Sequence, residues 1–202
     1  SLCSSVSFYA NKTLTTGEGG AFFTHDIDVY QHIKKVYNHG MTDERYIHCV
    51  LAHNYRMTNI QAAFLYDQLN DLDHILGLKK DIFNKSDKML DSYIQHHTVI
   101  KLVKEESTVN SNWMYCIMIP GINFKHLETH MNECQIQIRP FFYDIRSHDH
   151  LDDIKVNYNE TDVCKYGIMV PSYPEITTEQ QQYIVNCLKQ YIDLNIHNNR
   201  SK

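Results

Sequence analysis

The alternation of strand-like and helical segments along this sequence predicts a layered fold of the α/β or α+β class. Two short apolar runs near the start are separated by a glycine-containing turn, strongly periodic helical segments follow, and strands and helices alternate again in the second half. At 202 residues, 43% of them hydrophobic, the chain has enough apolar material for one sizeable domain or two small ones.

The first part of the chain is expected to form two strands followed by a helix. The strands are predicted at 2–9 and 20–24, on either side of a loop of small and polar residues that ends in glycines. Asp26 is placed to cap the helix that follows, because apolar residues then recur at helical spacing. The stretch 39–57 has the composition of a loop.

A long helical region comes next. Thr58 or Asn59 is expected to cap a strong helix over 60–76, and a second, more polar helical stretch runs on through about residue 95. Gly77 lies near the join, where we expect a break between two units.

The second half alternates strands with helices. In order along the chain we expect strands at 97–103 and 112–120, a helix at 123–134, a strand at 136–142, a capped segment near Asp162, a short strand-like run at 168–174, and a helix from Thr177 to about Leu194.

Charge, apolar pattern and cysteine usage exclude several classes of function. The formal net charge of −5, with no basic stripe, argues against a nucleic-acid partner. No apolar run approaches the length of a membrane span and no secretory signal is recognised, so we expect a cytoplasmic protein. The six cysteines are irregularly spaced, which suits free buried thiols better than disulfides or zinc. Because the sequence opens at Ser1 partway into a predicted strand, we expect a longer polypeptide.

The segment "SFYANKTLTTGEGG" (7–20) places one lysine, Lys12, in the loop between the first two predicted strands. The ordinary interpretation is a solvated loop lysine. The alternative is an amine held out of bulk water as a nucleophile. Lysine suits that role because its pKa falls readily on burial, whereas arginine stays protonated.

Several motifs occur in an order that resembles the DegT/StrS family of sugar-nucleotide aminotransferases. The lysine loop reads S-F-x-x-x-K-x-x-x-x-G-E-G-G, and the resemblance covers nearly all of the chain. The further motifs are "NHG" (38–40), "NYRMTNIQAA" (54–63), "NWMY" (112–115), "IRPFFY" (138–143) and "VPSYP" (170–174). The motifs "NYRMTN", "NWMY" and "RPFFY" look most like those of the branch that aminates C4 of nucleotide-linked 4-keto-6-deoxyhexoses, as perosamine synthases do.

The resemblance implies an α/β, aspartate-aminotransferase-like fold, which is fold type I among pyridoxal-phosphate enzymes. By the same resemblance, 1–77 is the C-terminal part of the large cofactor domain and 78–202 is a small α+β C-terminal domain. The family also needs an aspartate for the pyridine nitrogen, an aromatic that stacks on the ring, and a glycine-threonine phosphate loop. We expect these in an N-terminal half that is absent from these residues.

The resemblance also implies roles for four residues around pyridoxal 5'-phosphate. Lys12 is implied to form the resting imine with the cofactor and later to shuttle a proton. Because the family's dehydratases carry histidine at this position, a lysine here argues for transamination. Ser7 is implied to bond the cofactor phosphate. Asn54 and Arg56 are implied to reach into the neighbouring subunit's site in a homodimer. Without the resemblance, Ser7 would be interpreted as a strand-end serine that is hydrogen-bonded to the backbone. Arg56 would be interpreted as a member of an interface or of a structural ion pair.

The implied substrate side comprises Arg139 and Tyr143, with His39 and Trp113 as further candidates. A guanidinium suits a diphosphate and neighbouring rings suit a sugar or base, although aromatics and a lone histidine are more often packing. The implied reaction aminates a GDP- or dTDP-linked 4-keto-6-deoxyhexose with glutamate as donor. The alternatives are a C3 sugar aminotransferase and a non-catalytic subunit that keeps the fold.

No metal is expected, although the sequence has 13 histidines. His126 and His130 share a helix face and His148 and His150 flank Asp149, but zinc needs three or four converging ligands.

Overall fold

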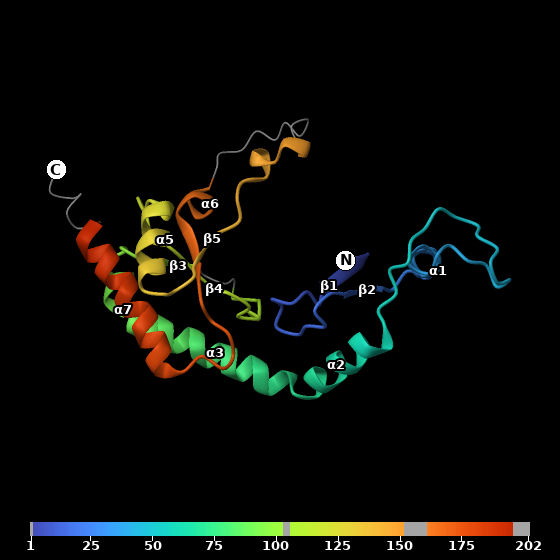
Figure 1. Cartoon of the computed structure of the whole chain (residues 1–202), viewed down its shortest axis with the longest axis horizontal. Helices are drawn as coiled ribbons and strands as arrows, with labels where there is room; N and C mark the ends of the chain where they lie inside the picture. The colour runs from blue at the N-terminus through green and yellow to red at the C-terminus, as the bar shows by residue number, and fades with distance from the viewer. Residues whose placement is uncertain (1, 103–105, 152–160, 196–202) are drawn as a thin grey trace. The chain divides into compact units, whose positions relative to one another are not determined.

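The computed structural model describes residues 2–102, 106–151 and 161–195. Its contacts divide the chain into two compact units, Ser1–Ile75 and Leu76–Lys202 (Figure 1). The chain is a mixed α/β structure in which strands and helices alternate, so the expected layered fold class is confirmed. None of the helices in the described ranges is long and apolar enough to cross a membrane.

The first unit begins with a β-hairpin that the sequence predicts. Strands β1 (Cys3–Ser7) and β2 (Gly20–Thr24) pair antiparallel. Helix α1 (Ile27–Tyr37) follows, and the Asp26 side chain caps it by accepting two backbone N–H bonds in the first turn. The predicted strands and the predicted cap are therefore confirmed.

The loop inside this hairpin is closed by backbone hydrogen bonds. The Phe8 N–H donates to the Gly19 carbonyl and the Thr16 N–H to the Phe8 carbonyl, each at 2.9 Å. A Cβ on Gly20 would lie 2.7 Å from the Val6 carbonyl oxygen, so the hairpin can close only with glycine there. The loop is therefore built into the end of the hairpin.

The helical region divides at a different residue from the predicted one. Helix α2 (Asn59–Asn70) starts with a capping box between Thr58 and Gln61 and ends at Asp71. Helix α3 (Leu72–Met89) then runs through Gly77 without interruption. The expected single helix over 60–76 is therefore wrong, because Asp71 caps α2 five residues earlier, whereas a glycine inside a helix costs only about 1 kcal/mol.

The second unit is built on an antiparallel sheet with strand order β3-β4-β6-β5. Its strands are β3 (Ile100–Lys101), β4 (Tyr115–Met118), β5 (Arg139–Pro140) and β6 (Gly167–Val170). Its further helices are α4 (Asp91–Gln95), α5 (Phe124–Glu133), η1 (Ile145–Ser147), η2 (Asp149–Leu151), α6 (Asp162–Tyr166) and α7 (Thr178–Asn195).

Two predicted strands are much shorter than expected. The run at 136–142 pairs only through Arg139 and Pro140, since proline has no N–H to continue a ladder. The run at 97–103 pairs through Ile100 and Lys101, and its last residue lies outside the described ones.

One face of the second unit's sheet forms the core with the helices. Tyr115 and Ile117 of β4 lie opposite Val170 and Ile168 of β6, and all four belong to a buried cluster with side chains of α3, α5 and α7. The six cysteines are thiols, as expected, but only Cys187 is buried. The expectation of uniformly buried thiols is therefore wrong for the chain as described.

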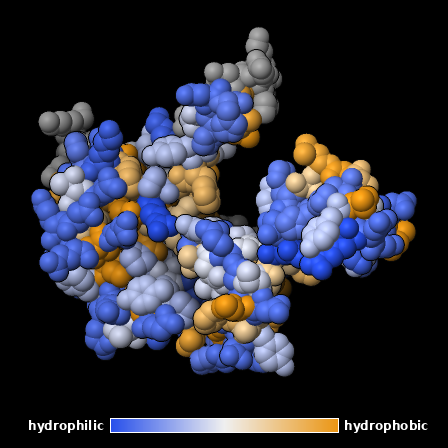
Figure 2. All heavy atoms as spheres, turned by 45° about the vertical axis from the view of Figure 1, so that its right-hand side comes forward, coloured by the Kyte–Doolittle hydropathy of each residue, from blue (hydrophilic) through white to orange (hydrophobic). Residues whose placement is uncertain are grey.

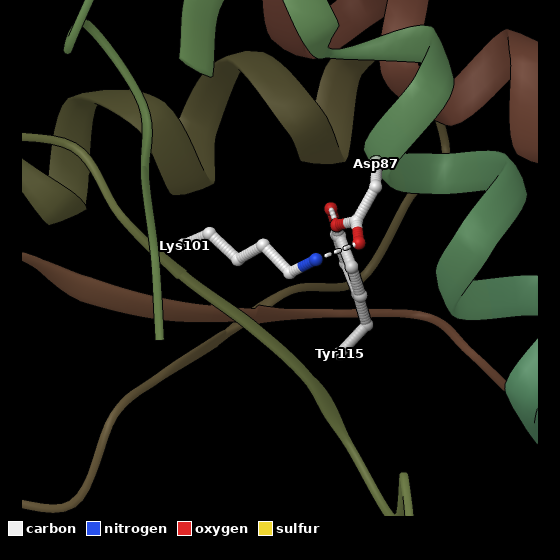
Figure 3. A network of polar contacts seen from close by, with 3 residues as sticks. All are labelled: Asp87, Lys101 and Tyr115. Atoms are coloured by element: carbon white, nitrogen blue, oxygen red, sulfur yellow. Dashed lines mark hydrogen bonds and ion pairs between the residues drawn. The ribbon is translucent and has the colours of Figure 1, made fainter. Parts of the chain in front are cut away.

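Polar side-chain contacts link α3 to this sheet. The Asp87 carboxylate accepts a hydrogen bond from the Tyr115 hydroxyl at 2.8 Å and forms an ion pair with Lys101 (Figure 3). Burial, followed by the nearby Asp87 charge, raises the pKa of Tyr115 well above its usual value. Tyr115 therefore stays a hydrogen-bond donor throughout the physiological range.

Candidate active site

Lys12 lies in the closed loop between β1 and β2, with its side chain half-buried. Its backbone N–H donates to the Tyr9 carbonyl at 2.9 Å, which folds the chain into a tight turn just before the lysine. The side chain is thus carried by a constrained loop and not by a helix face, which is the local setting that the sequence predicts for it.

Two glutamines of α2 fix this loop from the side. Gln68 accepts from the Thr15 N–H at 2.9 Å and donates to the Thr15 carbonyl at 2.7 Å. Gln61 donates to the Glu18 carbonyl at 3.0 Å. The two glutamines stand seven residues apart on one helix face, and that spacing is the signal that sequence reasoning passed over. They position the segment that carries Lys12.

Ser7 is the last residue of β1 and its side chain is exposed. Its Oγ accepts a hydrogen bond from the Tyr9 N–H at 3.3 Å. Accepting a bond leaves the hydroxyl hydrogen for another acceptor, because a serine hydroxyl both donates and accepts. Ser7 can therefore still donate to an anion beside the Lys12 loop.

Three predicted residues meet in the first unit. The Arg56 Nε donates to the Asn54 Oδ1 at 3.2 Å, and the Arg56 Nη2 lies 3.2 Å from the His39 Nε2. A guanidinium only donates, so the His39 Nε2 is the acceptor in this contact. An isolated antiparallel bridge between Asn38 and Asn54 brings the two loop segments together.

A hollow of about 850 Å³ lies beside this group within the first unit. Asn54 and Arg56 line it together with Gly19, Gly20 and Lys34. Its wall thus combines the cations of Lys34 and Arg56 and an amide with the carboxylate of Glu18 and several aromatic rings. Neither Lys12 nor Ser7 is among its lining residues.

The remaining candidates belong to the second unit. Arg139 is exposed on β5, where it pairs with Met169 of β6 on the sheet face opposite the core. The Phe141 N–H donates to the Gly167 carbonyl at 2.9 Å, which fixes the chain just after Arg139. Tyr143 is exposed further along, and Trp113 is half-buried two residues before β4. Arg139 is therefore displayed at a sheet edge and does not take part in the core.

The residues of the first unit offer the donor set that pyridoxal phosphate needs. Lys12 supplies a primary amine for an aldehyde, and Ser7, Asn54 and Arg56 supply hydroxyl, amide and guanidinium donors for a phosphate. Gly19, with φ +135°, and Gly20 keep the backbone bare at the end of the loop, where a planar ring could approach closely. The donor set therefore fits the aldehyde and phosphate groups of this cofactor.

Within the described residues, no group of three or more histidine, cysteine, aspartate or glutamate side chains is arranged to hold a metal. The rings of His148 and His150 lie 5.9 Å apart. His130 instead contacts a backbone carbonyl, that of Cys187, at 2.9 Å.

Most of this chain is similar in sequence to known aminotransferases. Residues 1–189 match the sequence model of the DegT/DnrJ/EryC1/StrS aminotransferase family. A GDP-perosamine synthase of Escherichia coli O157:H7 is 32% identical over 192 residues, which cover 93% of this chain and 51% of that protein. A dTDP-4-amino-4,6-dideoxy-D-glucose transaminase of Shigella dysenteriae is 24% identical over 195 residues, covering 92% of this chain and 51% of that protein. The chain thus spans about half the length of these relatives.

Solved structures agree on the fold. An aminotransferase of Helicobacter pylori involved in the biosynthesis of pseudoaminic acid superposes with a TM-score of 0.81 at 20% sequence identity. The superposition covers 96% of this chain and 52% of that one. At this identity the likeness shows the fold alone.

Proposed function

Because the chain belongs to the DegT/DnrJ/EryC1/StrS aminotransferase family, whose members are pyridoxal-phosphate-dependent, we propose that it acts as an aminotransferase on a nucleotide-linked 4-keto-6-deoxyhexose. The observation that carries the proposal is Lys12 in its closed loop, fixed to α2 through Thr15 and Gln68. A positioned lysine is what transamination requires of the protein, since pyridoxal phosphate itself supplies the electron sink when bound.

Lys12 has two tasks in this proposal. It holds the cofactor through its amine, and as an uncharged amine it moves a proton to or from the carbon that bears the reacting nitrogen. Ser7, at the end of β1, donates its hydroxyl hydrogen to the cofactor phosphate. Both residues flank the same tight turn, so a movement of the loop would displace them together.

In this proposal, Asn54 and Arg56 of one subunit bind an anion in the active site of the other subunit of a homodimer. Their mutual hydrogen bond orients the guanidinium, and the adjoining N-terminus of α2 favours negative charge. Both side chains are exposed on this chain, as a residue that acts on a neighbouring subunit must be. We therefore propose that each active site uses Lys12 from one subunit and Asn54 with Arg56 from the other.

On the substrate side, Arg139 and Tyr143 bind the nucleotide-sugar, with His39 and Trp113 as further contacts. The exposed guanidinium of Arg139 suits a diphosphate. Relatives named for GDP-linked and dTDP-linked sugars support amination at C4, with glutamate as the proposed donor. A C3 aminotransferase is the second candidate within the family.

The apolar surface of the first unit supports a division into domains. Within its described residues only Phe8 and Leu65 are buried apolar side chains, whereas large apolar side chains such as Ile60 and Phe64 are exposed. Figure 2 shows apolar patches reaching the surface between polar ones. Exposed apolar surface of this extent is typical of an interface. We propose that 1–77 completes a larger cofactor domain and that 78–202 is the small C-terminal domain.

The test uses the complete protein that contains these residues, pyridoxal phosphate, and glutamate labelled with ¹⁵N. GDP-linked and dTDP-linked 4-keto-6-deoxyhexoses and the corresponding 3-keto-6-deoxyhexoses are supplied separately as acceptors. The proposal predicts transfer of ¹⁵N to C4, detected by mass spectrometry and NMR. Transfer only to the C3 of a 3-keto sugar would favour the second candidate. No transfer to any of these acceptors by a protein that carries the cofactor would contradict both.

A further inference from the structure

The segment that precedes Arg56 is bonded to the C-terminal end of helix α1. Two backbone hydrogen bonds, of 3.1 and 2.9 Å, run from the segment 53–55 to the last two residues of this helix. In the same region, Asn54 faces Asn38 in an isolated antiparallel bridge. These bonds fix the backbone as far as residue 55. The long Arg56 side chain needs contacts of its own to keep one orientation, because an unrestrained arginine samples many rotamers.

His39 supplies one of these contacts to Arg56. The His39 Nε2 lies 3.2 Å from the Arg56 Nη2 and accepts a hydrogen bond from it, since a guanidinium only donates. The Arg56 Nε in turn donates to the Asn54 Oδ1 at 3.2 Å. The guanidinium is thus held at two of its nitrogens from within the chain, and it keeps further N–H groups that can bind an anion.

The backbone fixes the position of the His39 ring. His39 is half-buried and has a φ of +60°, a left-handed conformation that few residues other than glycine adopt. Its N–H donates to the His53 carbonyl at 2.9 Å, and its carbonyl accepts from the His48 Nδ1 at 2.7 Å. At the next residue, Gly40, a Cβ would clash with the Val50 carbonyl oxygen. The N–H, the carbonyl and the ring of His39 are therefore all bonded to the segment that leads to Arg56.

We propose that His39 is a positioning residue, which orients Arg56 for the phosphate of pyridoxal phosphate in the neighbouring subunit's site. This inference rests on the proposed role of Arg56 as an anion contact between subunits. His39 acts through Arg56 in it, a role distinct from the substrate contact considered above. A guanidinium that is oriented before binding loses less conformational freedom when it binds a phosphate. What the imidazole supplies is one hydrogen-bond acceptor at a fixed place.

The experiment compares the affinities of pyridoxal phosphate and of pyridoxal, which lacks the phosphate, for the complete protein freed of cofactor. Both compounds carry the aldehyde that reacts with a lysine amine, and the change in their absorbance on binding reports the titration. His39→Leu removes the acceptor from Arg56. We expect pyridoxal phosphate to bind about tenfold more weakly, because a hydrogen bond to a charged group is lost. The affinity for pyridoxal should stay unchanged, which also shows that the variant folds.

Three further variants separate a positioning role from a structural one. His39→Gln places an amide oxygen near the position of the imidazole Nε2 and should restore the affinity for pyridoxal phosphate. Arg56→Ala should weaken binding of pyridoxal phosphate, and adding His39→Leu to it should cause no further loss, because a residue that acts only through Arg56 then has nothing to orient. His32→Leu, the same substitution at an exposed position of α1, should bind both compounds like the wild type.

Several outcomes would overturn the proposal. Equal losses for pyridoxal and pyridoxal phosphate in His39→Leu would show a structural role. The same would follow if His39→Gln bound pyridoxal phosphate as weakly as His39→Leu, or if the losses of the double variant were additive. Wild-type affinity in Arg56→Ala would instead remove the phosphate contact on which the inference rests. No amino donor or sugar nucleotide is present, so an error in the proposed transamination would leave these titrations unchanged.

Discussion

Gln68 and Thr15 form a paired amide contact that joins α2 to the loop carrying Lys12. The Gln68 Oε1 accepts from the Thr15 N–H at 2.9 Å, and the Gln68 Nε2 donates to the Thr15 carbonyl at 2.7 Å. The same Nε2 also donates to the Phe64 carbonyl at 2.8 Å, so the amide is oriented by its own helix. A loop held by a preoriented amide loses little freedom when it binds a ligand.

Replacing Gln68 should therefore disturb Lys12 without removing it. In the complete protein, Gln68→Met keeps the side-chain length and removes both bonds to Thr15, each of which is worth about 1 kcal/mol. We expect bound pyridoxal phosphate to be retained but the glutamate half-reaction to slow roughly tenfold, because small misplacements of a reacting group are costly. Stopped-flow absorbance of the cofactor measures this rate. Gln182→Met is the control, since among the described residues the Gln182 side chain donates to Asn186 on its own helix and not to the loop of Lys12. Equal slowing in both variants would contradict the positioning role.

Lys79 gives the second unit a pH-dependent stability. This α3 side chain is 4% exposed, and its Nζ donates to the carbonyl of Ser172 and, at 3.5 Å, to the Ser172 hydroxyl. Burial lowers the pKa of Lys79 from 10.5 to about 8, partly opposed by the Glu175 charge. Between these pH values the unfolded chain binds more protons than the folded one, so stability should rise with pH across this window.

Comparison of the wild type with Lys79→Met isolates this effect. The stability of the wild type relative to the variant should increase by about 2 kcal/mol between pH 7.5 and pH 9.5. Urea unfolding followed through Trp113, the chain's one tryptophan, reports it. A constant difference across this range would contradict the assignment. Tyr115, with a raised pKa, contributes in the opposite direction only at higher pH.

The proposed dimer predicts complementation between inactive variants. In the complete protein, Lys12→Ala removes the amine of one subunit and Arg56→Ala removes the anion contact that it offers to the other. Hybrid dimers then hold one intact site, so equal mixing should restore about a quarter of the wild-type activity. Turnover is measured after subunit exchange, which labelled subunits verify by mass spectrometry. If exchange is complete and turnover stays absent, Lys12 and Arg56 do not act in trans.

Arg139 should act in substrate binding. Its side chain is exposed at the edge strand β5, outside the core, so Arg139→Ala should fold normally. Loss of a charge-assisted contact to a diphosphate costs about 2–5 kcal/mol when the partner is left unpaired. If the contact is equal in ground and transition states, KM for the sugar nucleotide should rise while kcat stays nearly constant. The glutamate half-reaction, measured separately, should be unaffected. An equal loss of rate in both half-reactions would indicate that Arg139 has a structural role and does not bind the substrate.

Local features of the fold could be predicted from the sequence because their determinants are close in the chain. Asp26 caps α1 through N–H groups two and three residues away, and Thr58 caps α2 with Gln61 in the same way. The break at Asp71 was missed because an aspartate inside an apolar helical pattern carries no strong stop signal. Glycine is a common stop signal for a helix, yet Gly77 lies inside α3 and does not end it.

Contacts between distant residues could not be predicted in this way. His39 and Arg56 are 17 residues apart and meet because a loop folds back through the bridge between Asn38 and Asn54. Lys79 and Ser172 are 93 residues apart, and no periodic pattern relates them. The motifs identified the residues of the candidate site, but tertiary packing decides which of them touch.

Covalent attachment of pyridoxal phosphate to Lys12 can be detected by reduction and mass spectrometry. The complete protein is loaded with the cofactor, treated with sodium borohydride to fix any covalent attachment, digested with trypsin, and sequenced by mass spectrometry. We expect a pyridoxyl phosphate mass on Lys12, a missed cleavage after that residue, and no such label in the Lys12→Ala variant. A label on another lysine, such as Lys34 beside the hollow of the first unit, with Lys12 unmodified, would contradict it.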